Sequence, residues 1–261
     1  MIKRIVPLLL IPFLFSCVGQ ERCAERELIA HACGEIDGYI YTNSLEALQR
    51  AATNGYRYIE ADLLFTSDSV LVAAHSWEEF NCMTGNAHRG DSAMMLKEFL
   101  AQRIHGRYTP LTASMLNEYF MNDTSLFLVT DKVSDPLLLA GNFPALKQRM
   151  VVEAFSYDHY RQLVGEGYFR VLYSCMADDF FSSVAKNLLL EELFPGPRIE
   201  WIALHTSGFE RLSFTIINRL RRFNIALFTV DDYSTMPSWQ LERVKMIYTN
   251  KLMPSMAENN Q

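Results

Sequence analysis

Residues 56–75 read Tyr-Arg-Tyr-Ile-Glu-Ala-Asp-Leu-Leu-Phe-Thr-Ser-Asp-Ser-Val-Leu-Val-Ala-Ala-His and contain two runs typical of β-strands, Tyr56–Leu63 and Val70–His75. The link between them, residues 64–69, is too short to hold a crossover helix. The second run is therefore expected either to form a hairpin with the first or to return across the fold without a helix.

Short apolar runs recur along the rest of the chain and alternate with amphipathic stretches. Continuous runs such as Ile225-Ala226-Leu227-Phe228 favour a parallel sheet that is covered on both faces. Repeated strand–helix units over the length of one domain predict an α/β fold, a (β/α)8 TIM-type barrel, although the nine strands counted are one too many. Residues 76–109 interrupt this rhythm with polar clusters, and we interpret them as a rim insertion after the third strand. The other expected strands are Leu28–His31, Leu126–Asp131, Met150–Phe155, Phe169–Ser174, Ile199–His205, Ile225–Val230 and Met246–Thr249.

Helices are expected between most of these strands. Asn43 opens one of them, Asn43–Asn54, and Glu46 follows three residues later, which is the spacing of a capping box. The others are Leu111–Met121, Pro136–Arg149, Tyr157–Glu166, Asp178–Leu193, Phe209–Arg222 and Pro237–Arg243.

Composition excludes several classes of protein. The 261 residues are 49% hydrophobic and 21% charged, which is enough apolar surface for a full core and unlike disordered, collagen-like or coiled-coil chains. With 24 basic and 30 acidic residues the net charge is −6, which argues against a nucleic-acid partner.

The first seventeen residues have the pattern of an export signal. Lys3 and Arg4 precede Ile5–Phe15, an apolar run too short to span a bilayer but of the length found in secretory signals. Leu14-Phe15-Ser16-Cys17 resembles a bacterial lipobox, in which the cysteine is lipidated and becomes the new N-terminus. An ordinary signal peptide with a chance cysteine is the alternative. We therefore expect an exported lipoprotein on the periplasmic or cell-surface side, held to a membrane by acyl chains on Cys17, with residues 18–261 forming the barrel.

Four further cysteines are scattered along the chain. Their spacing contains no CxxC pair, and a chain of this length needs no disulfide staple. We expect Cys23, Cys33, Cys82 and Cys175 to be mostly free and buried.

Polar side chains end several expected strands, and a barrel of this type forms its active site at that rim. His31, His75 and Asp131 each end a strand, whereas Glu60 and Asp62, two residues apart, face the same side of another. Three carboxylates gathered in this way suit a hard cation such as Mg²⁺ or Ca²⁺, although a Glu-x-Asp pair alone more often lies on a solvated face. Two histidines beside a metal-bound phosphodiester can serve as general acid and general base.

Other residues are weaker candidates for a substrate pocket. Glu153, His205, Trp77, Trp201 and Tyr173 lie near expected strand ends or are aromatic, although such aromatic residues more often belong to the core. Asp231-Asp232 is expected to form a turn or a helix cap.

Taken in order, these motifs resemble the glycerophosphodiester phosphodiesterase family, within the superfamily that includes phosphatidylinositol-specific phospholipases C. The series spans nearly the whole expected mature chain and is specific as a set, whereas each piece alone is weak. The matching segments are His31, Thr42-Asn43-Ser44, Gly55, Ile59-Glu60-Ala61-Asp62, Thr66-Ser67-Asp68, Leu71–His75, Tyr108-Thr109-Pro110-Leu111, Leu128–Lys132, Phe228–Asp231 and Ile247–Asn250.

The resemblance implies roles for these residues. Glu60, Asp62 and Asp131 would hold one divalent cation, Mg²⁺ or Ca²⁺, while His31 and His75 would act as acid and base. The substrate would be a glycerophosphodiester, a phospholipid head group or a sugar-phosphate polymer. A hydroxyl of the substrate's own alcohol would attack phosphorus and give a cyclic phosphate that water opens. No protein nucleophile is then needed, and the sequence contains no GxSxG, P-loop or HExxH motif.

Two motifs depart from the family pattern. The usual His-Arg-Gly reads His31-Ala32-Cys33-Gly34, and the usual His-Asp reads His75-Ser76. Three carboxylates and a phosphodiester outweigh the charge of one divalent ion, so a further cation is expected near the site. We expect Lys132 to supply it.

Arg89 is a second hypothesis for the missing arginine. His88-Arg89-Gly90 looks like the family's first motif, but no apolar strand precedes it. Arg89 would instead reach over the site from the insertion.

Two other functions remain open. A catalytically eroded lipoprotein, its site lost at Ala32 and Ser76, would bind a phosphorylated ligand without turnover. A glycoside hydrolase would use Glu60 and a second carboxylate about 5 to 10 Å away, but would leave the histidines without a role.

Overall fold

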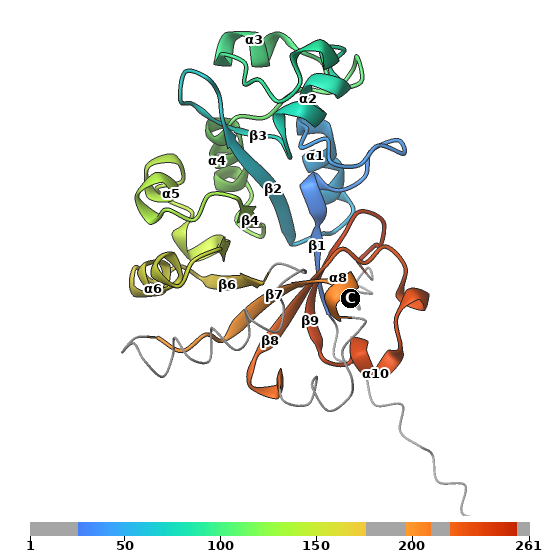
Figure 1. The fold of residues 1–261 in the computed structure, drawn as a ribbon, viewed down its shortest axis with the longest axis vertical. Helices are drawn as coiled ribbons and strands as arrows, with labels where there is room; N and C mark the ends of the chain where they lie inside the picture. Colours follow the sequence, from blue (N-terminus) through green and yellow to red (C-terminus); the bar gives the residue numbers. More distant parts are fainter. Residues whose placement is uncertain (1–25, 176–196, 210–219, 255–261) are drawn as a thin grey trace, which may run out of the picture.

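In a computed structural model the chain is built around a closed barrel of eight parallel strands (Figure 1). The structure describes residues 26–175, 197–209 and 220–254. Neighbouring strands follow the order β1-β2-β4-β5-β6-β7-β8-β9, and β9 pairs with β1 to close the ring. The predicted TIM-type barrel is thereby confirmed. The strands are β1 (Glu27–Ala30), β2 (Tyr58–Phe65), β4 (Phe127–Asp131), β5 (Met150–Ala154), β6 (Arg170–Cys175), β7 (Trp201–His205), β8 (Asn224–Phe228) and β9 (Val244–Thr249).

The ninth expected strand is a hairpin partner of β2 and takes no place in the barrel. β3, Leu71–Ala73, runs antiparallel to the end of β2, with Leu63 opposite Ala73 and Phe65 opposite Leu71. Of the two alternatives that the short link allowed, the hairpin is correct. Because β2 runs two residues beyond its expected end, the hairpin rises above the rim and brings the chain back to the barrel at His75.

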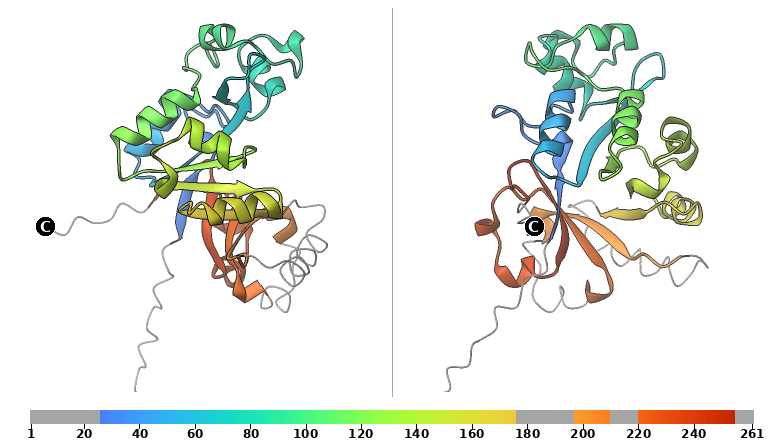
Figure 2. Two further views of the ribbon diagram at one scale, coloured as in Figure 1. Left: turned by 90° about the vertical axis from the view of Figure 1, so that its left-hand side faces the viewer. Right: turned by 180° about the vertical axis from the view of Figure 1, so that it is seen from behind.

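Helices lie outside the barrel, as the two views in Figure 2 show. Most begin close to the residues expected. Pro136–Arg149 is wrong as a single helix, because Phe143 precedes Pro144 and takes a non-helical conformation that ends α5. The helices are α1 (Leu45–Thr53), α2 (Trp77–Met83), α3 (Leu96–Ala101), α4 (Ala113–Asn122), α5 (Pro136–Asn142), α6 (Tyr157–Gly165), α8 (Thr206–Phe209) and α10 (Ser238–Leu241).

The start of α1 differs from the predicted one. The capping box at Asn43 is wrong: Ser44 caps α1 by accepting a hydrogen bond from the Ala47 N–H. The Glu46 carboxylate instead accepts hydrogen bonds from Thr109. The expected helix Asp178–Leu193 lies outside the described residues, as does most of Phe209–Arg222.

Alternation along the strands divides the barrel interior into an apolar layer and a polar rim. One set of alternate residues, drawn from all eight strands, packs into a buried apolar cluster: Ile29, Tyr58, Val129, Val151, Leu172, Ala203, Ala226, Met246 and Tyr248. Moving two residues toward the carboxyl end of a strand keeps the side chain inside and raises it to the rim. The residues reached in this way are Glu60, then Asp62, on β2, Asp131 on β4, Glu153 on β5, Ser174 on β6, His205 on β7 and Phe228 on β8.

The insertion expected at residues 76–109 contains α2 and α3 and lies beyond the end of β2 (Figure 1). Its own apolar contacts hold it together: the Phe80 and Phe99 rings stack with centroids 4.6 Å apart, and Trp77 meets Phe99 at 6.0 Å. The Trp77 indole N–H donates to the Phe65 carbonyl at 3.1 Å, which ties the insertion to the hairpin.

The cysteine prediction holds in part. Cys33 is free and buried, whereas Cys82 is free but exposed, on the outer face of α2. Cys23 and the Cys175 side chain lie outside the described part of the chain, as do Cys17 and the expected signal segment. Among the described residues no helix is long and apolar enough to cross a bilayer.

Candidate active site

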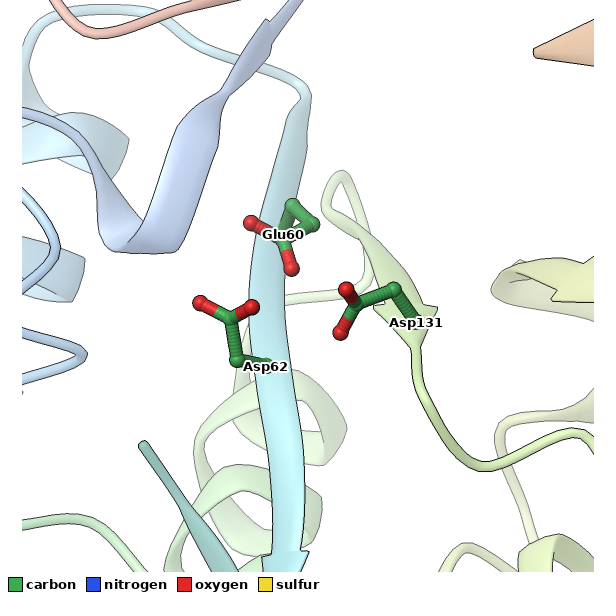
Figure 3. A group of neighbouring side chains, drawn as sticks. All are labelled: Glu60, Asp62 and Asp131. Atoms are coloured by element: carbon green, nitrogen blue, oxygen red, sulfur yellow. The ribbon is translucent and has the colours of Figure 1, made fainter. Parts of the chain in front are cut away.

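Three carboxylates meet at the carboxyl end of the barrel. Asp62 on β2 pairs in register with Asp131 on β4, and Glu60 projects from β2 on the same side (Figure 3). One oxygen from each of these residues lies within 4.8 Å of the other two. Glu60 and Asp62 are each only 1% exposed and Asp131 is half-buried, so the group is largely withdrawn from solvent.

The backbone at the end of β1 holds Glu60. The Ala32 N–H donates to Glu60 Oε2 at 2.5 Å, and both Ala32 and Cys33 have positive φ angles, 48° and 67°. This turn aims a backbone donor at the Glu60 carboxylate. Ala32 is fully buried, so position 32 supports the acidic group through its main chain.

Asn43 orients Asp62. Its side-chain Nδ2 donates to Asp62 Oδ2 at 2.8 Å, and its Oδ1 accepts the Asp62 N–H at 3.0 Å. Asn43 is buried and has a φ of 46°, a left-handed conformation that asparagine adopts more readily than most residues. Sequence patterns indicate only a helix start at Asn43. The signal that could have found it is the Thr-Asn-Ser motif itself.

Lys132 supplies a cation directly to the acidic group. Its Nζ lies 2.5 Å from Asp62 Oδ1 and 3.2 Å from Asp131 Oδ2. Lys132 has a φ of 59°, and this left-handed turn after β4 accompanies the return of its side chain to the rim. Burial alone would lower the pKa of Lys132, but the carboxylates of Asp131 and Asp62 raise it, so the ammonium stays charged.

The carboxylates are not fully compensated by these contacts. Burial, and then the charges of Asp62 and Asp131, raise the pKa of Glu60 well above its ordinary value. Burial and Asp62 do the same to the pKa of Asp131. For Asp62 burial acts in the same direction, but Lys132 and Asn43 outweigh it, so its pKa is lowered. Glu60 Oε1 and Asp131 Oδ1 are buried and accept no hydrogen bond from any residue that the structure describes.

Both predicted histidines lie at this acidic group. His31 Nδ1 lies 2.9 Å from the Thr229 hydroxyl, and His75 Nδ1 lies 2.8 Å from a Glu79 carboxylate oxygen. The Tyr41 ring lies between them, with its centroid 4.9 Å from each imidazole. Residues far apart in the sequence, on β2 and β4, just after β1 and just before the insertion, thus converge on one site.

These residues line a cleft of about 390 Å³ at the barrel rim. Glu153 lies on its floor, where burial raises the pKa of its carboxyl and the Tyr248 hydroxyl donates a short hydrogen bond to it. His205 lines the cleft and its Nδ1 lies 2.8 Å from the Ser207 hydroxyl. The described residues around the cleft are His31, Tyr41, Glu60, Asp62, His75, Asp131, Lys132, Glu153, Phe155, Ser174, His205, Phe228, Thr229 and Tyr248.

Several expected residues lie elsewhere. Arg89 does not reach the cleft as far as the described chain shows: it lies in the insertion, where its guanidinium pairs with Glu98 at 3.2 Å. Trp77 belongs to the insertion core, and Trp201 stacks with Arg170 at the far end of β7. Tyr173 packs against Tyr160 outside the barrel.

The Asp231-Asp232 prediction is confirmed. The Asp232 side chain accepts a hydrogen bond from the Ser234 N–H and caps a short turn of helix. Asp231 accepts the Asn250 N–H at 2.7 Å and ties the two last strand ends together.

We expect His31 to stay neutral down to about pH 5 in the metal-free protein. Burial lowers the pKa of its imidazole to about 4, against about 6.5 in an unfolded chain. Because the unfolded chain binds this proton at higher pH, the contribution of His31 to stability is complete above about pH 6.5 and is lost as the pH falls toward 4. Histidine-selective ¹H–¹⁵N NMR across this range measures the titration, and a His31 ring that charges near pH 6.5 contradicts the expectation.

A family model matches part of this chain. Residues 36–155 match the Glycerophosphoryl diester phosphodiesterase family. The matched segment contains the three carboxylates, His75 and Lys132, whereas His31 and His205 lie outside it. No curated protein sequence matches the chain significantly.

Solved structures share the fold over most of its length. A glycerophosphodiester phosphodiesterase from Thermotoga maritima is 16% identical with a TM-score of 0.65, over 87% of this chain and 95% of that one. One from Parabacteroides distasonis is 17% identical with a TM-score of 0.62, over 87% and 93%. An Oleispira antarctica phosphodiesterase, solved in complex with the product sn-glycerol-3-phosphate, is 17% identical with a TM-score of 0.61, over 86% and 92%.

Proposed function

We propose that this protein is a phosphoric diester hydrolase that cleaves a glycerophosphodiester or a phospholipid head group with the help of one divalent cation. Its residues 36–155 match the Glycerophosphoryl diester phosphodiesterase family. The observation that carries the proposal is the convergence of two imidazoles and three carboxylates on a single cleft. A binding protein has no need of two histidines flanking a metal site, whereas acid–base catalysis requires them.

The acidic group fits a hard divalent cation. Glu60 Oε1 and Asp131 Oδ1 are buried acceptors without donors among the described residues, and together with Asp62 they form an all-oxygen ligand set. Oxygen ligands of this kind favour Mg²⁺ or Ca²⁺ over softer metals. When bound, the cation neutralises part of the phosphodiester charge and polarises a phosphoryl oxygen.

The two histidines perform the proton transfers. One imidazole accepts the proton of the attacking hydroxyl, which belongs to the substrate's own alcohol. The other imidazole takes up a proton as the anionic diester binds beside it and donates that proton to the departing alkoxide oxygen. The P–O bond to the leaving alcohol breaks as the new P–O bond forms, and a cyclic phosphate results. The histidines exchange roles when water opens the ring, so both end in their starting protonation states.

Lys132 takes the place of the arginine that the family motif has at the position of Ala32. It is the one lysine or arginine among the described residues that line the cleft. Its ammonium already lies against Asp62 and Asp131, where a phosphodiester bound beside the metal would also lie. Glu153, whose pKa burial raises, and His205 line the same cleft and offer hydrogen-bonding groups to the alcohol part of the substrate.

Phosphorus NMR with glycerophosphocholine, glycerophosphoinositol and intact phosphatidylinositol as substrates tests the proposal. We expect cleavage of at least one diester, loss of activity with EDTA, and recovery with Mg²⁺ or Ca²⁺. Binding of a diester without turnover at any metal concentration would instead identify the eroded binding protein. Retention of full activity in EDTA would refute the metal requirement.

We also propose that the protein is an exported lipoprotein anchored through Cys17. The support is the order of charges, apolar run and lipobox-like residues at the start of the sequence. In a bacterial host the wild-type protein is expected in the membrane fraction with an acylated N-terminus. Cys17→Ala is expected to accumulate as the uncleaved precursor, with no acylated N-terminus in mass spectra. An unmodified Cys17 in the mature wild-type protein would overturn this.

A further inference from the structure

The carboxylate that holds His75 comes from the insertion. Glu79 Oε2 lies 2.8 Å from His75 Nδ1, and Glu79 is the third residue of α2, four positions after the histidine. The family resemblance does not point to Glu79. Its His-Asp motif has the acidic residue directly after the histidine, where this chain has Ser76.

The local sequence offers Glu79 another partner, which it does not take. Ser76-Trp77-Glu78-Glu79 is a capping-box pattern, in which the glutamate would turn back to the backbone N–H of the serine. Half of the box forms, because the Ser76 hydroxyl oxygen accepts the Glu79 N–H at 3.1 Å. The carboxylate, however, lies on the imidazole instead of the backbone.

We propose that Glu79 is a positioning residue that keeps the proton of neutral His75 on Nδ1 and so leaves Nε2 as the proton acceptor facing the cleft. An ionised carboxylate only accepts hydrogen bonds, so the nitrogen beside it must carry the hydrogen. The same contact stabilises the imidazolium after Nε2 has taken a proton. This inference rests on the proposed function for its kinetic consequence, but not for the tautomer.

Further contacts hold the ring and its helix, while the His75 and Glu79 side chains themselves are 38% and 47% exposed. The Tyr41 ring packs on His75, and the Ala74 N–H donates to the Asp62 carbonyl at 3.0 Å, which fixes the backbone just before the histidine. On the far side, α2 is held by Trp77 and Phe80 in the insertion core. The insertion therefore supplies a carboxylate that the motif position Ser76 cannot.

The tautomer is measured directly on the full chain with ¹⁵N-labelled histidine at alkaline pH. We expect His75, assigned with a His75→Asn variant, to carry its hydrogen on Nδ1 in the wild type. In Glu79→Ala the hydrogen is expected to move mainly to Nε2, the ordinary preference of a free imidazole. An Nδ1–H tautomer that persists in Glu79→Ala would overturn the proposal whether or not the protein cleaves phosphodiesters.

Kinetics separate positioning from a merely structural role. We expect Glu79→Ala to lower kcat about 10- to 100-fold with KM changed less than about twofold, because substrate contacts remain. Glu79→Gln preserves the shape of the side chain, and its kcat is expected to lie between those of the wild type and Glu79→Ala. This variant covers the case in which the alanine variant fails to fold.

Glu78→Gln is the matched control. Glu78 is exposed, lies in the same first turn of α2 and carries the same charge, so any effect on the helix end is shared. We expect wild-type kcat and an unchanged His75 tautomer in this variant. Equal losses of kcat in the Glu78 and Glu79 variants would overturn the proposal, since they would show an effect on the helix alone. A wild-type protein with no phosphodiesterase activity would refute the proposed function and leave the tautomer result to decide the role of Glu79.

Discussion

Replacing Glu60 by glutamine is expected to abolish activity and, at the same time, to stabilise the metal-free protein. Burial and the charges of Asp62 and Asp131 raise the pKa of Glu60, so its charged form is unfavourable in the folded state without a cation. Glutamine keeps the shape and removes the charge. Because the folded-state pKa is raised, the wild-type contribution of Glu60 to metal-free stability is present below about pH 4.5 and is lost as the pH rises.

Three measurements check this expectation. At neutral pH in EDTA the variant should unfold a few degrees above the wild type. Saturating Mg²⁺ or Ca²⁺ should raise the unfolding temperature of the wild type but not of the variant, since the ligand set is incomplete. kcat/KM should fall by about 10³-fold or more.

Glu153→Gln is the matched control, because Glu153 is also a buried carboxyl of the cleft but lies outside the three-carboxylate group. It should retain the cation-dependent stabilisation. A Glu60→Gln protein that is still stabilised by the cation, or still active, would show that Glu60 is not a metal ligand.

Lys132→Met is expected to damage both the substrate site and the stability of the metal-free protein. The ammonium contacts Asp62 and Asp131, and its loss leaves the buried Asp62 carboxylate with Asn43 as its remaining side-chain donor. Breaking a buried pair costs about 3 to 5 kcal/mol, and a partly exposed lysine lowers that to about 2 to 4 kcal/mol. Urea unfolding in EDTA measures this loss of stability. Saturating cation is expected to restore part of the lost stability. kcat/KM is expected to fall about 10²- to 10⁴-fold, because no other lysine or arginine among the described residues lines the cleft.

Arg89→Ala distinguishes the two cations considered for the missing motif arginine. Its guanidinium pairs with Glu98 in the insertion, so we expect kcat/KM within about twofold of the wild type. A large loss in Arg89→Ala combined with a small one in Lys132→Met would show that the insertion moves over the cleft and that Arg89 is the phosphate-binding residue after all.

Much of the architecture could be predicted from local patterns. Alternation with period two placed Glu60 and Asp62 on one side of a strand, and the strand ends placed Asp131 and His75 at the same rim. These inferences succeed because strand periodicity and the parallel order of a barrel are properties of short segments repeated around a ring.

Local patterns did not predict which side chains hold the site residues. Asn43 was assigned to a helix cap, and the structure gives that task to Ser44 and turns Asn43 toward Asp62. Pattern alone could not separate these, since both residues are good caps. The Glu79 contact is not readable from spacing either. Glu79 lies three residues after Ser76, as in a capping box, and four residues after His75, and spacing does not choose between these partners.

Residue patterns along the chain are enough to predict the barrel and the acidic and imidazole groups at its rim, because strand order and side-chain alternation repeat in short segments. Which donors hold those groups depends on long-range contacts instead. Ala32, Asn43 and Lys132 reach the carboxylates from left-handed backbone conformations in loops, and Thr229 reaches His31 from nearly two hundred residues away. Such contacts depend on how loops from different strands meet, and the free energy that selects them arises from burying charge in a shared cleft, which no single segment contains.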